Sequence, residues 1–382
     1  TIIALIHRQQ AALHRERYEL YHIAVKTLLA SWDENKELTT HEKLQYLKLD
    51  DLRRLMESIA YWVHTQGNNG DKGGTVIDCD DLLNQLTKEI RRSKRIELYQ
   101  AEEEAKRFIE LIKERTGLLN EQGKDCYAFV HKTFQEYLCA EEIDYRADNE
   151  DDFGIVLEHI NKHPHDPHWR EVLLLLVSQQ RPKKAVKAIR KILNRGSDYE
   201  QWLHRDLFLA AACLAENIKE LYVTDEKLGE EILRGLVDLE VSENNKIGFR
   251  VHSQIFPILS RFSETDFEKR ALELLKDEGD KIDKLRLQKY RGELGEKQEA
   301  IADLIKLFTD EDRDLRLSAA FTLGQLDKDS NEVVNALIKL LTDEDSGIRS
   351  NAAFALGQLG KDSDEVIKAL IKLLTDEDRD VR

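Results

Sequence analysis

The C-terminal part of the chain repeats itself, and this repetition constrains the fold more than any other feature. The segment Val333-Val-Asn-Ala-Leu-Ile-Lys-Leu-Leu-Thr-Asp-Glu-Asp345 recurs with few changes 33 residues earlier and 33 residues later. Each unit carries two apolar stripes at helical spacing, namely Val334, Leu337, Ile338 and Leu341, then Ile348, Ala352, Leu356 and Leu359. Neither helix can bury its stripe alone. The repetition therefore predicts helix pairs that stack into a solenoid.

These units resemble HEAT repeats of the short prokaryotic type, which also occur in phycobilisome lyases. The resemblance rests on the steps Asp312…Arg316, Asp345…Arg349 and Asp378…Arg382, followed by Ala-Ala and Leu-Gly where the chain continues. The Thr-Pro-Leu-His turn of ankyrin repeats and the Trp-Leu-Gly-Tyr pattern of tetratricopeptide repeats are absent. We expect each aspartate to cap the second helix of its unit. Each arginine either pairs with a carboxylate of the next repeat or forms a solvated i, i+4 pair, and both alternatives stay open.

Composition extends the helical prediction upstream. Only four prolines and eighteen glycines occur in 382 residues, so long stretches can run as uninterrupted helix. Degenerate helix pairs follow one another from residue 168, and the second helix of the first pair is predicted at 201–216. The fold class is all-α, with a winged-helix and helical region followed by an α-solenoid of HEAT-like repeats.

The N-terminal third follows a different pattern. Apolar stripes predict helices around 18–32, 52–63 and 105–112. Leu118–Glu121 and Cys126–Val130 flank Gln122-Gly-Lys-Asp125, which is a hairpin signal, and Thr133 with Glu136 has the spacing of a capping box that opens a last helix. A three-helix core with a small hairpin is a winged-helix arrangement. The loop Gly67–Gly74 lacks the order of a phosphate-binding loop and is predicted to be a plain connection.

One block of this region resembles a known family. Phe129-Val-His-Lys-Thr-Phe-Gln-Glu-Tyr-Leu-Cys-Ala140 is similar to the signature that closes the nucleotide-binding module of NACHT-type STAND NTPases. The segments Thr1–His7 and Glu16–Trp32 look like the helices that follow the NTPase core in that family. The resemblance covers about residues 1–180, and a HEAT array is a common sensor in bacterial members. Because Thr1 is not Met and the chain stops within a repeat, we expect this chain to be a piece of a longer polypeptide.

The resemblance also implies a nucleotide site that these residues do not form alone. The chain has no Walker A loop and no acidic Walker B strand, so we expect it to be no enzyme and to hold no cofactor by itself. ATP or ADP with Mg²⁺ is implied for the full-length protein, whose NTPase core would be a partner. His131 lies at a strand-to-helix junction. In the resembling family the corresponding histidine contacts the phosphate of ADP, whereas the alternative for His131 is local capping or packing.

Other candidate chemistry has a plainer explanation. Four histidines fall within ten residues, but Pro164 and Pro167 interrupt any regular face, so we expect a polar linker here and not a metal site; the histidines are His159, His163, His165 and His168. Cys126 and Cys139 are expected to be small buried side chains. No nucleophile elbow or complete catalytic constellation occurs.

Charge narrows the expected partners. The formal net charge is −16, which argues against nucleic acid, and the basic run Arg91–Arg95 is the one feature that favours DNA binding. The three acidic triads recur in register and predict a negative stripe for a protein or peptide partner with a basic surface. Alternatively, they cap helices and keep the repeats in solution. The triads are Asp310, Glu311 and Asp312; Asp343, Glu344 and Asp345; and Asp376, Glu377 and Asp378. No apolar stretch is long enough to span a membrane and no signal peptide is recognisable, so we expect a cytoplasmic protein.

The expected organisation follows from these observations. A helical segment at 1–65 precedes a winged-helix region at 66–150; a linker and the first solenoid helix occupy 151–180, and the solenoid occupies 181–382, with its units clearest at 299–382. We expect the chain to be the regulatory and sensing portion of a NACHT-type signalling NTPase. The intact protein is expected to self-associate when activated and to act in bacterial defence against phage. The alternatives are a phycobilin-lyase-like HEAT enzyme and a plain protein-binding scaffold.

Overall fold

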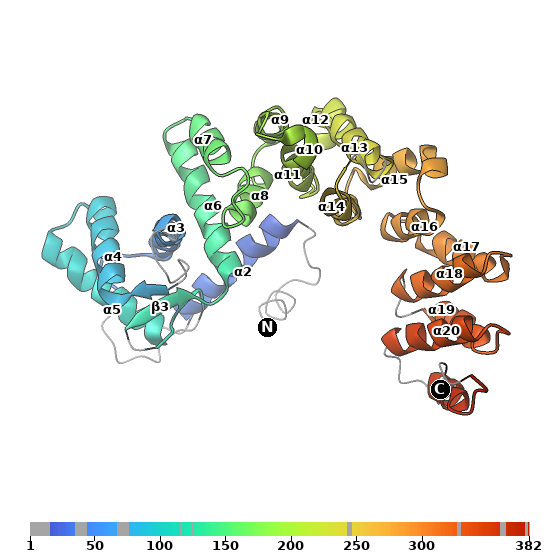
Figure 1. The fold of residues 1–382 in the computed structure, drawn as a ribbon. Coiled ribbons are helices and arrows are strands. Elements are labelled where there is room, and N and C mark those ends of the chain that lie inside the picture. The colour runs from blue at the N-terminus through green and yellow to red at the C-terminus, as the bar shows by residue number, and fades with distance from the viewer. Residues whose placement is uncertain are drawn as a thin grey trace. The chain divides into compact units, whose positions relative to one another are not determined.

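A computed structural model of the chain describes residues 16–34, 44–66, 76–114, 117–123, 125–242, 247–326, 330–359, 364–378 and 381. The segment 1–7, the glycine-rich loop 67–74 and Arg382 lie outside these residues. The chain forms two compact units, of which the first comprises Thr1–Asp198 with Ala212–Asp225 and the second comprises Tyr199–Ala211 with Glu226–Arg382. Figure 1 shows both units and labels most of their elements.

The first unit contains the three helices of a winged helix, namely α3 (Leu49–Gln66), α4 (Cys79–Lys94) and α5 (Leu98–Glu114). Helix α4 begins at a side-chain cap, because the carboxylate of Asp78 accepts a hydrogen bond from the backbone N–H of Asp80. It ends at Arg95, whose left-handed backbone (φ 53°) stops the helix. Its apolar face is fully buried through Leu82, Leu86 and Ile90, as helical spacing requires.

A three-stranded antiparallel sheet completes the winged helix, with the strand order β1 (Val76–Asp78), β3 (Cys126–Phe129), β2 (Leu119–Glu121). The predicted hairpin is confirmed, and its register pairs Asn120 with Ala128. The turn passes through Gly123 at φ 121°, a conformation that glycine adopts without strain. Strand β1 was not predicted. It pairs Ile77 with Tyr127 and brings the segment after α3 onto the hairpin.

The rest of the first unit is helical. Helix α6 (Lys132–Asn149) follows the hairpin, and the further helices are α2 (Arg17–Glu34), α7 (Gly154–Lys162), α8 (Arg170–Ser178), α9 (Pro182–Leu193) and α12 (Leu221–Thr224). Helix α2 packs on α6 through aromatic rings, with the Tyr18 and Tyr21 centroids 5.7 and 5.9 Å from that of Tyr137. Helix α8 has an almost wholly apolar sequence and is buried at every position from Val172 to Val177.

The second unit is a series of helix pairs. The pairs are α13 (Glu226–Glu240) with α14 (Phe249–Ser260), α15 (Glu268–Asp277) with α16 (Lys284–Glu293), α17 (Lys297–Lys306) with α18 (Arg313–Leu326), and α19 (Asn331–Leu340) with α20 (Ser346–Leu359), followed by α21 (Asp364–Leu373). The predicted stripes form its core, since Val334, Leu337, Ile348, Ala352 and Leu356 are buried. The all-α prediction with a solenoid after a winged helix is confirmed.

The helix predicted at 201–216 is wrong in one respect, because it is broken. Helix α10 (Glu200–Leu203) stops at His204, which has a left-handed backbone (φ 49°), and α11 (Arg205–Leu214) starts anew. The carboxylate of Glu200 accepts hydrogen bonds from the backbone N–H groups of Asp206 and Leu207. The first turn of α11 is thus capped by a side chain from the preceding helix, which local periodicity does not reveal.

Candidate functional site

His131 occupies the position that the sequence predicts, between β3 and α6. Its backbone is extended (φ −134°, ψ 134°), its side chain is exposed, and it makes no side-chain cap to the helix. The ring of Phe134 is close to it, with the two centroids 6.0 Å apart. An exposed imidazole therefore lies beside the first turn of a helix, where backbone N–H groups favour anions.

The predicted capping box at Thr133 and Glu136 is wrong. Helix α6 begins at Lys132, so the N-cap position belongs to His131, and Thr133 already lies inside the first turn. Glu136 instead forms an ion pair with Lys132 (3.2 Å) and is only 4% exposed. Burial raises the pKa of Glu136, and the hydrogen bond from Lys132 opposes that rise.

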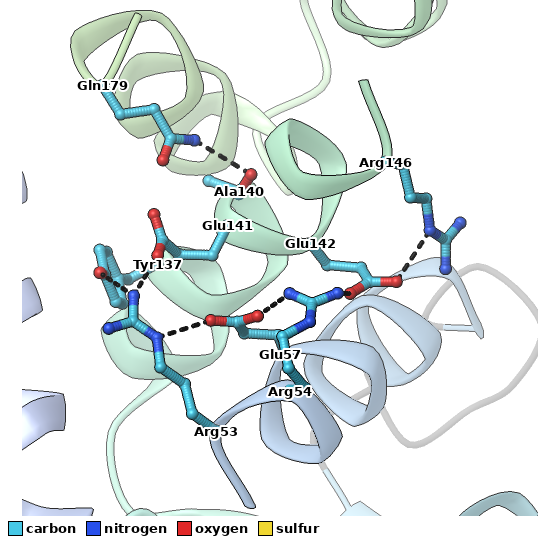
Figure 2. A network of polar contacts seen from close by, with 9 residues as sticks. All are labelled: Arg53, Arg54, Glu57, Tyr137, Ala140, Glu141, Glu142, Arg146 and Gln179. Atoms are coloured by element: carbon cyan, nitrogen blue, oxygen red, sulfur yellow. Dashed lines mark hydrogen bonds and ion pairs between the residues drawn. The ribbon is translucent and has the colours of Figure 1, made fainter. Parts of the chain in front are cut away.

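A network of arginines and glutamates joins α3 to α6 (Figure 2). Arg53 donates from Nε to the Glu57 carboxylate (2.8 Å) and also pairs with Glu141. Arg54 pairs with Glu57 on its own helix and, at 2.6 Å, with Glu142 on α6. Glu57 and Glu142 are 3% and 2% exposed. Two buried carboxylates thus depend on these arginines for their stabilisation.

The same face of α6 reaches further elements of the first unit. Arg146 donates to Glu142 (2.8 Å), and its guanidinium carbon lies 4.0 Å from the centroid of the Tyr61 ring. Gln179, just after α8, donates its amide to the backbone carbonyl of Ala140 at 3.1 Å, which is visible in Figure 2. Helix α6 is therefore tied at one end to the turn that carries His131 and along its length to α3 and α8.

Of the four histidines in the predicted linker, His159 lies in α7, and the other three lie in the connection between α7 and α8. His163 stacks on the Trp169 ring with centroids 4.1 Å apart, the His159 ring lies 5.8 Å from it, and His165 contacts the Ser197 hydroxyl at 2.9 Å. His168 stacks on His64 of α3, with centroids 3.9 Å apart and an interplanar angle of 9°. The sequence did not predict this contact, because His64 lies 104 residues before His168.

His64 is the most deeply buried of these rings. It is 1% exposed, and neither ring nitrogen makes a hydrogen bond of normal geometry with the described residues. Burial, with added repulsion from His168, Lys132 and His163, lowers the pKa of His64 to about 3, and the backbone of His168 offsets part of this. Within the described ranges, no group of three or more His, Cys, Asp or Glu side chains is arranged to hold a metal ion.

The aspartates of the acidic triads fold the turns in which they lie. The first aspartate of every triad accepts a hydrogen bond from the backbone N–H of the third at 2.9 Å; these are Asp310, Asp343 and Asp376. The third caps the next helix where the helix continues, as Asp312 does for Leu315 and Asp345 for Ile348. The middle residues, Glu311, Glu344 and Glu377, are exposed.

Arginines connect successive repeats. Arg349 donates twice to Asp376 of the next repeat, at 2.8 and 2.7 Å, and once to the carbonyl of Asp343 in its own turn. The predicted ladder is therefore present at Arg349. In the preceding repeat it is made by a different residue, because Arg313 pairs with Asp345. Arg316, which the sequence favoured, donates instead to the carbonyl of Asp310 in its own turn.

One surface feature of the repeats was missed. Phe321 and Phe354 occupy equivalent positions on α18 and α20, and their rings stack with centroids 6.3 Å apart. They are 40% and 54% exposed, although phenylalanine in a repeat core is normally buried. The recurrence of Ala-Ala-Phe at 33 residues is the sequence signal for this pair, and only the structure shows that the rings are exposed while Ala319, Ala320 and Ala352 are buried.

Two stretches of the chain match known families. Residues 17–143 match the family described as the winged helix-turn-helix domain C-terminal to NACHT, and residues 292–382 match HEAT repeats. The chain carries a NACHT-associated winged helix and HEAT repeats. The winged-helix match includes His131 and the network between α3 and α6, and the HEAT match includes all three acidic triads. The family match thus begins before the region at 66–150 and takes in α2 and α3.

Comparison with solved structures adds only a distant likeness. One matched chain comes from a structure titled "Structure of the Pds5-Scc1 complex and implications for cohesin function", with 15% sequence identity and a TM-score of 0.31. The match covers 94% of the present chain and 59% of that chain. A search of curated proteins found no match. No helix in the described ranges is both long and apolar enough to cross a lipid bilayer.

Proposed function

We propose that the chain is the regulatory and sensing portion of a NACHT-type signalling NTPase. The observation that carries this proposal is the match of residues 17–143 to the winged helix that follows NACHT modules. In this proposal the HEAT repeats bind a protein partner, and the winged helix couples binding to ATP/ADP-controlled self-association. The setting that we propose is the cytoplasm of a bacterium, in defence against phage. The chain by itself holds no nucleotide and hydrolyses none.

His131 is the proposed contact to the diphosphate of ADP in the intact protein. Its exposed ring beside the first turn of α6 supports this role, because both the imidazole and the nearby N–H groups can donate to phosphate oxygens. Contacts of α6 with α3 and with Gln179 give a mechanical connection from that turn to the rest of the unit. A change of nucleotide at His131 would then shift a packed helix and not an isolated loop.

The test uses the full-length protein, with ADP dissociation measured by release of a fluorescent ADP analogue. A coding sequence without a Walker A motif before residue 1 would already refute the proposal. His131→Ala should raise the off-rate about tenfold or more, since a lost hydrogen bond to a charged acceptor is worth roughly 1.5–3 kcal/mol. Thr133→Ala is the matched control, because Thr133 is exposed on the same turn and caps nothing. Equal off-rates for His131→Ala and the wild type would leave His131 a structural residue.

The proposed partner surface of the HEAT repeats is acidic and partly aromatic. The triad aspartates are used in turns and caps, so the exposed glutamates in the middle of each triad are the charges left to meet a basic partner. The exposed pair Phe321 and Phe354 supplies apolar area on the second helices of the same repeats. Charge of this kind mainly raises the association rate.

A charge-reversal pair tests this surface against a labelled lysine-rich peptide. Glu311→Lys with Glu344→Lys should slow association several-fold at about 50 mM salt and less at higher salt, because screening weakens exposed charges. The control is Glu299→Lys with Glu332→Lys, which makes the same change of charge at the same spacing on exposed positions of the first helices. Equal rates for the two double variants would refute a role for the triads in particular.

A further inference from the structure

The end of α3 and the connection 163–169 between α7 and α8 meet in a cluster of rings. The His64 ring of α3 has the ring of His168 stacked on it at 3.9 Å and meets the buried ring of Trp169 edge to face at 4.6 Å. The Nε2 atom of His168 also donates to the backbone carbonyl of His64 at 3.0 Å. This carbonyl belongs to the last turn of α3, where carbonyl groups lack partners within the helix. His168 therefore caps α3 and holds the connection against its end.

The position of His64 suits a neutral ring and not a protonated one. The side chain is almost completely buried, and neither ring nitrogen makes a hydrogen bond of normal geometry with the described residues. An imidazolium has two N–H donors, so a proton taken up here would bury a charge without acceptors. The stacked ring of His168 would add repulsion once it is also protonated. Proton uptake therefore favours a conformation in which His64 reaches water.

The charged groups around His64 either repel a proton there or have other partners. Lys132 and the neighbouring histidines add repulsion. The carboxylate of Glu136 pairs with Lys132 at 3.2 Å, and that of Asp166 accepts a hydrogen bond from the backbone N–H of His168 at 2.9 Å. The titratable and charged side chains that face the cluster are Tyr61 of α3, Lys132 and Glu136 of α6, His159 and Lys162 of α7, His163 and Asp166 of the connection, and Glu171 of α8, which pairs with Arg17. None of these carboxylates is left to stabilise a proton on His64.

We propose that His64 and His168 form an acid-sensitive latch, which holds the connection 163–169 on the end of α3 and releases it when His64 takes up a proton. The connection has a second tie, because His165 lies 2.9 Å from the hydroxyl of Ser197, so release opens only the side that faces α3. Lys132, the first residue of α6, borders the latch, and its opening therefore alters the surroundings of that turn. The latch goes beyond the proposed function and does not depend on it.

The test is hydrogen–deuterium exchange of the chain at pH 7.5 and 5.5, corrected for the intrinsic pH dependence of amide exchange. The amides of Trp169 and Leu173 report on the connection, because they donate to the carbonyls of Asp166 and Trp169. Burial lowers the pKa of His64 to about 3, whereas a histidine in water has a pKa of about 6.5. The open form should therefore become about tenfold more populated at pH 5.5, and protection of these amides should fall by the same factor.

Variants of the latch separate its titration from its packing. His64→Phe keeps a flat ring without proton-binding nitrogens and should show no fall in protection between the two pH values. His64→Leu is a smaller variant without a titrating group, for use if the phenyl ring does not fit, and should behave in the same way. His165→Asn is the control, because it removes a histidine of the same connection that is not part of the stack, and it should keep the tenfold fall.

Three outcomes contradict the proposal. Equal protection of the connection at both pH values in the wild type would show that acid does not release it. A tenfold fall that persists in the folded His64 variants would assign the response to another group. A parallel fall in the amides of α4, which lies away from the latch, would show that the whole winged helix opens and that the connection does not move separately. Circular dichroism at pH 7.5 verifies that each variant is folded.

Discussion

Acidification should destabilise the first unit through His64. The ring is 1% exposed and its pKa is lowered to about 3, whereas an unfolded histidine has a pKa of about 6.5. Between these values the unfolded state binds a proton that the folded state does not. The free energy of unfolding therefore rises with pH from about 3 to 6.5, and the stability present at pH 7.5 is lost as pH falls through that window.

The size of the effect follows from the two pKa values. At pH 5.0 an unfolded histidine is almost fully protonated and His64 in the fold is almost fully neutral, so linkage gives a loss of about 2 kcal/mol relative to pH 7.5. His159 and His163 also have lowered pKa values because of burial and add to the loss, whereas Glu136, whose pKa is raised by burial, opposes it. His64→Phe keeps a flat ring against His168 and removes the titrating nitrogens, so its loss should be smaller by about 2 kcal/mol.

The assay is urea unfolding at pH 7.5 and 5.0, followed by tryptophan fluorescence, because Trp169 contacts His64 edge to face at 4.6 Å and reports on this cluster. Tyr61→Phe is the control. It removes the hydroxyl that lies 3.2 Å from His159 Nε2 and leaves His64 in place, so it should keep the full contribution of His64. If His64→Phe loses as much stability between the two pH values as the wild type, the ring is not buried in its neutral form and the reasoning is wrong.

Three further predictions concern packing, charge and chemistry. Gly229→Ala would place a methyl carbon 2.3 Å from the buried ring of Phe267. In urea unfolding this variant should destabilise the second unit by about 1–3 kcal/mol. The methyl carbon of the control Gly357→Ala meets nothing within 4 Å, so this variant should not destabilise the unit. Arg54→Met leaves Glu57 and Glu142 with fewer partners and should lower the free energy of unfolding by about 2–4 kcal/mol. Lys184→Met breaks an exposed ion pair with Asp148 and should change it by less than about 0.5 kcal/mol. Equal losses in the two variants would show that burial of the ion pairs does not matter. The purified chain should show no ATP or GTP hydrolysis above the buffer background in a phosphate-release assay, and turnover in several preparations would show that the missing Walker motifs are not required.

Local patterns predicted the elements whose partners are close in sequence. The stripes of the repeats were predicted because Leu337 and Ile348 pack within their own unit or against the next copy, where the same residues recur. The hairpin at 118–130 was predicted for the same reason, since a short turn brings its strands together. Strand β1 escaped prediction because its three residues are too short for a pattern, and only pairing with β3 makes them a strand.

Side-chain contacts of the site were predicted less well. Sequence spacing placed His131 at the start of a helix, but it does not reveal that Lys132 is the first helical residue. For this reason the capping box was assigned to Thr133. The histidines near Trp169 looked irregular because their order along the chain carries no information about His64 on a distant helix. Arg313 was overlooked because the equivalent residue of the next repeat is Ser346, so repetition did not draw attention to it.

The arginine contacts between repeats have a consequence for how this protein can change. Arg313 and Arg349 each pair with a carboxylate of the next repeat. Phe321 and Phe354 stack between the two repeats that carry these arginines. Both ion pairs join an arginine to an aspartate of the following acidic triad, although the arginine comes from a different position in each unit. Recombination between such similar stretches of coding sequence can remove or add whole units while the new junction keeps an interface of the existing kind. The array can therefore vary in length between close relatives while each remaining unit keeps its fold.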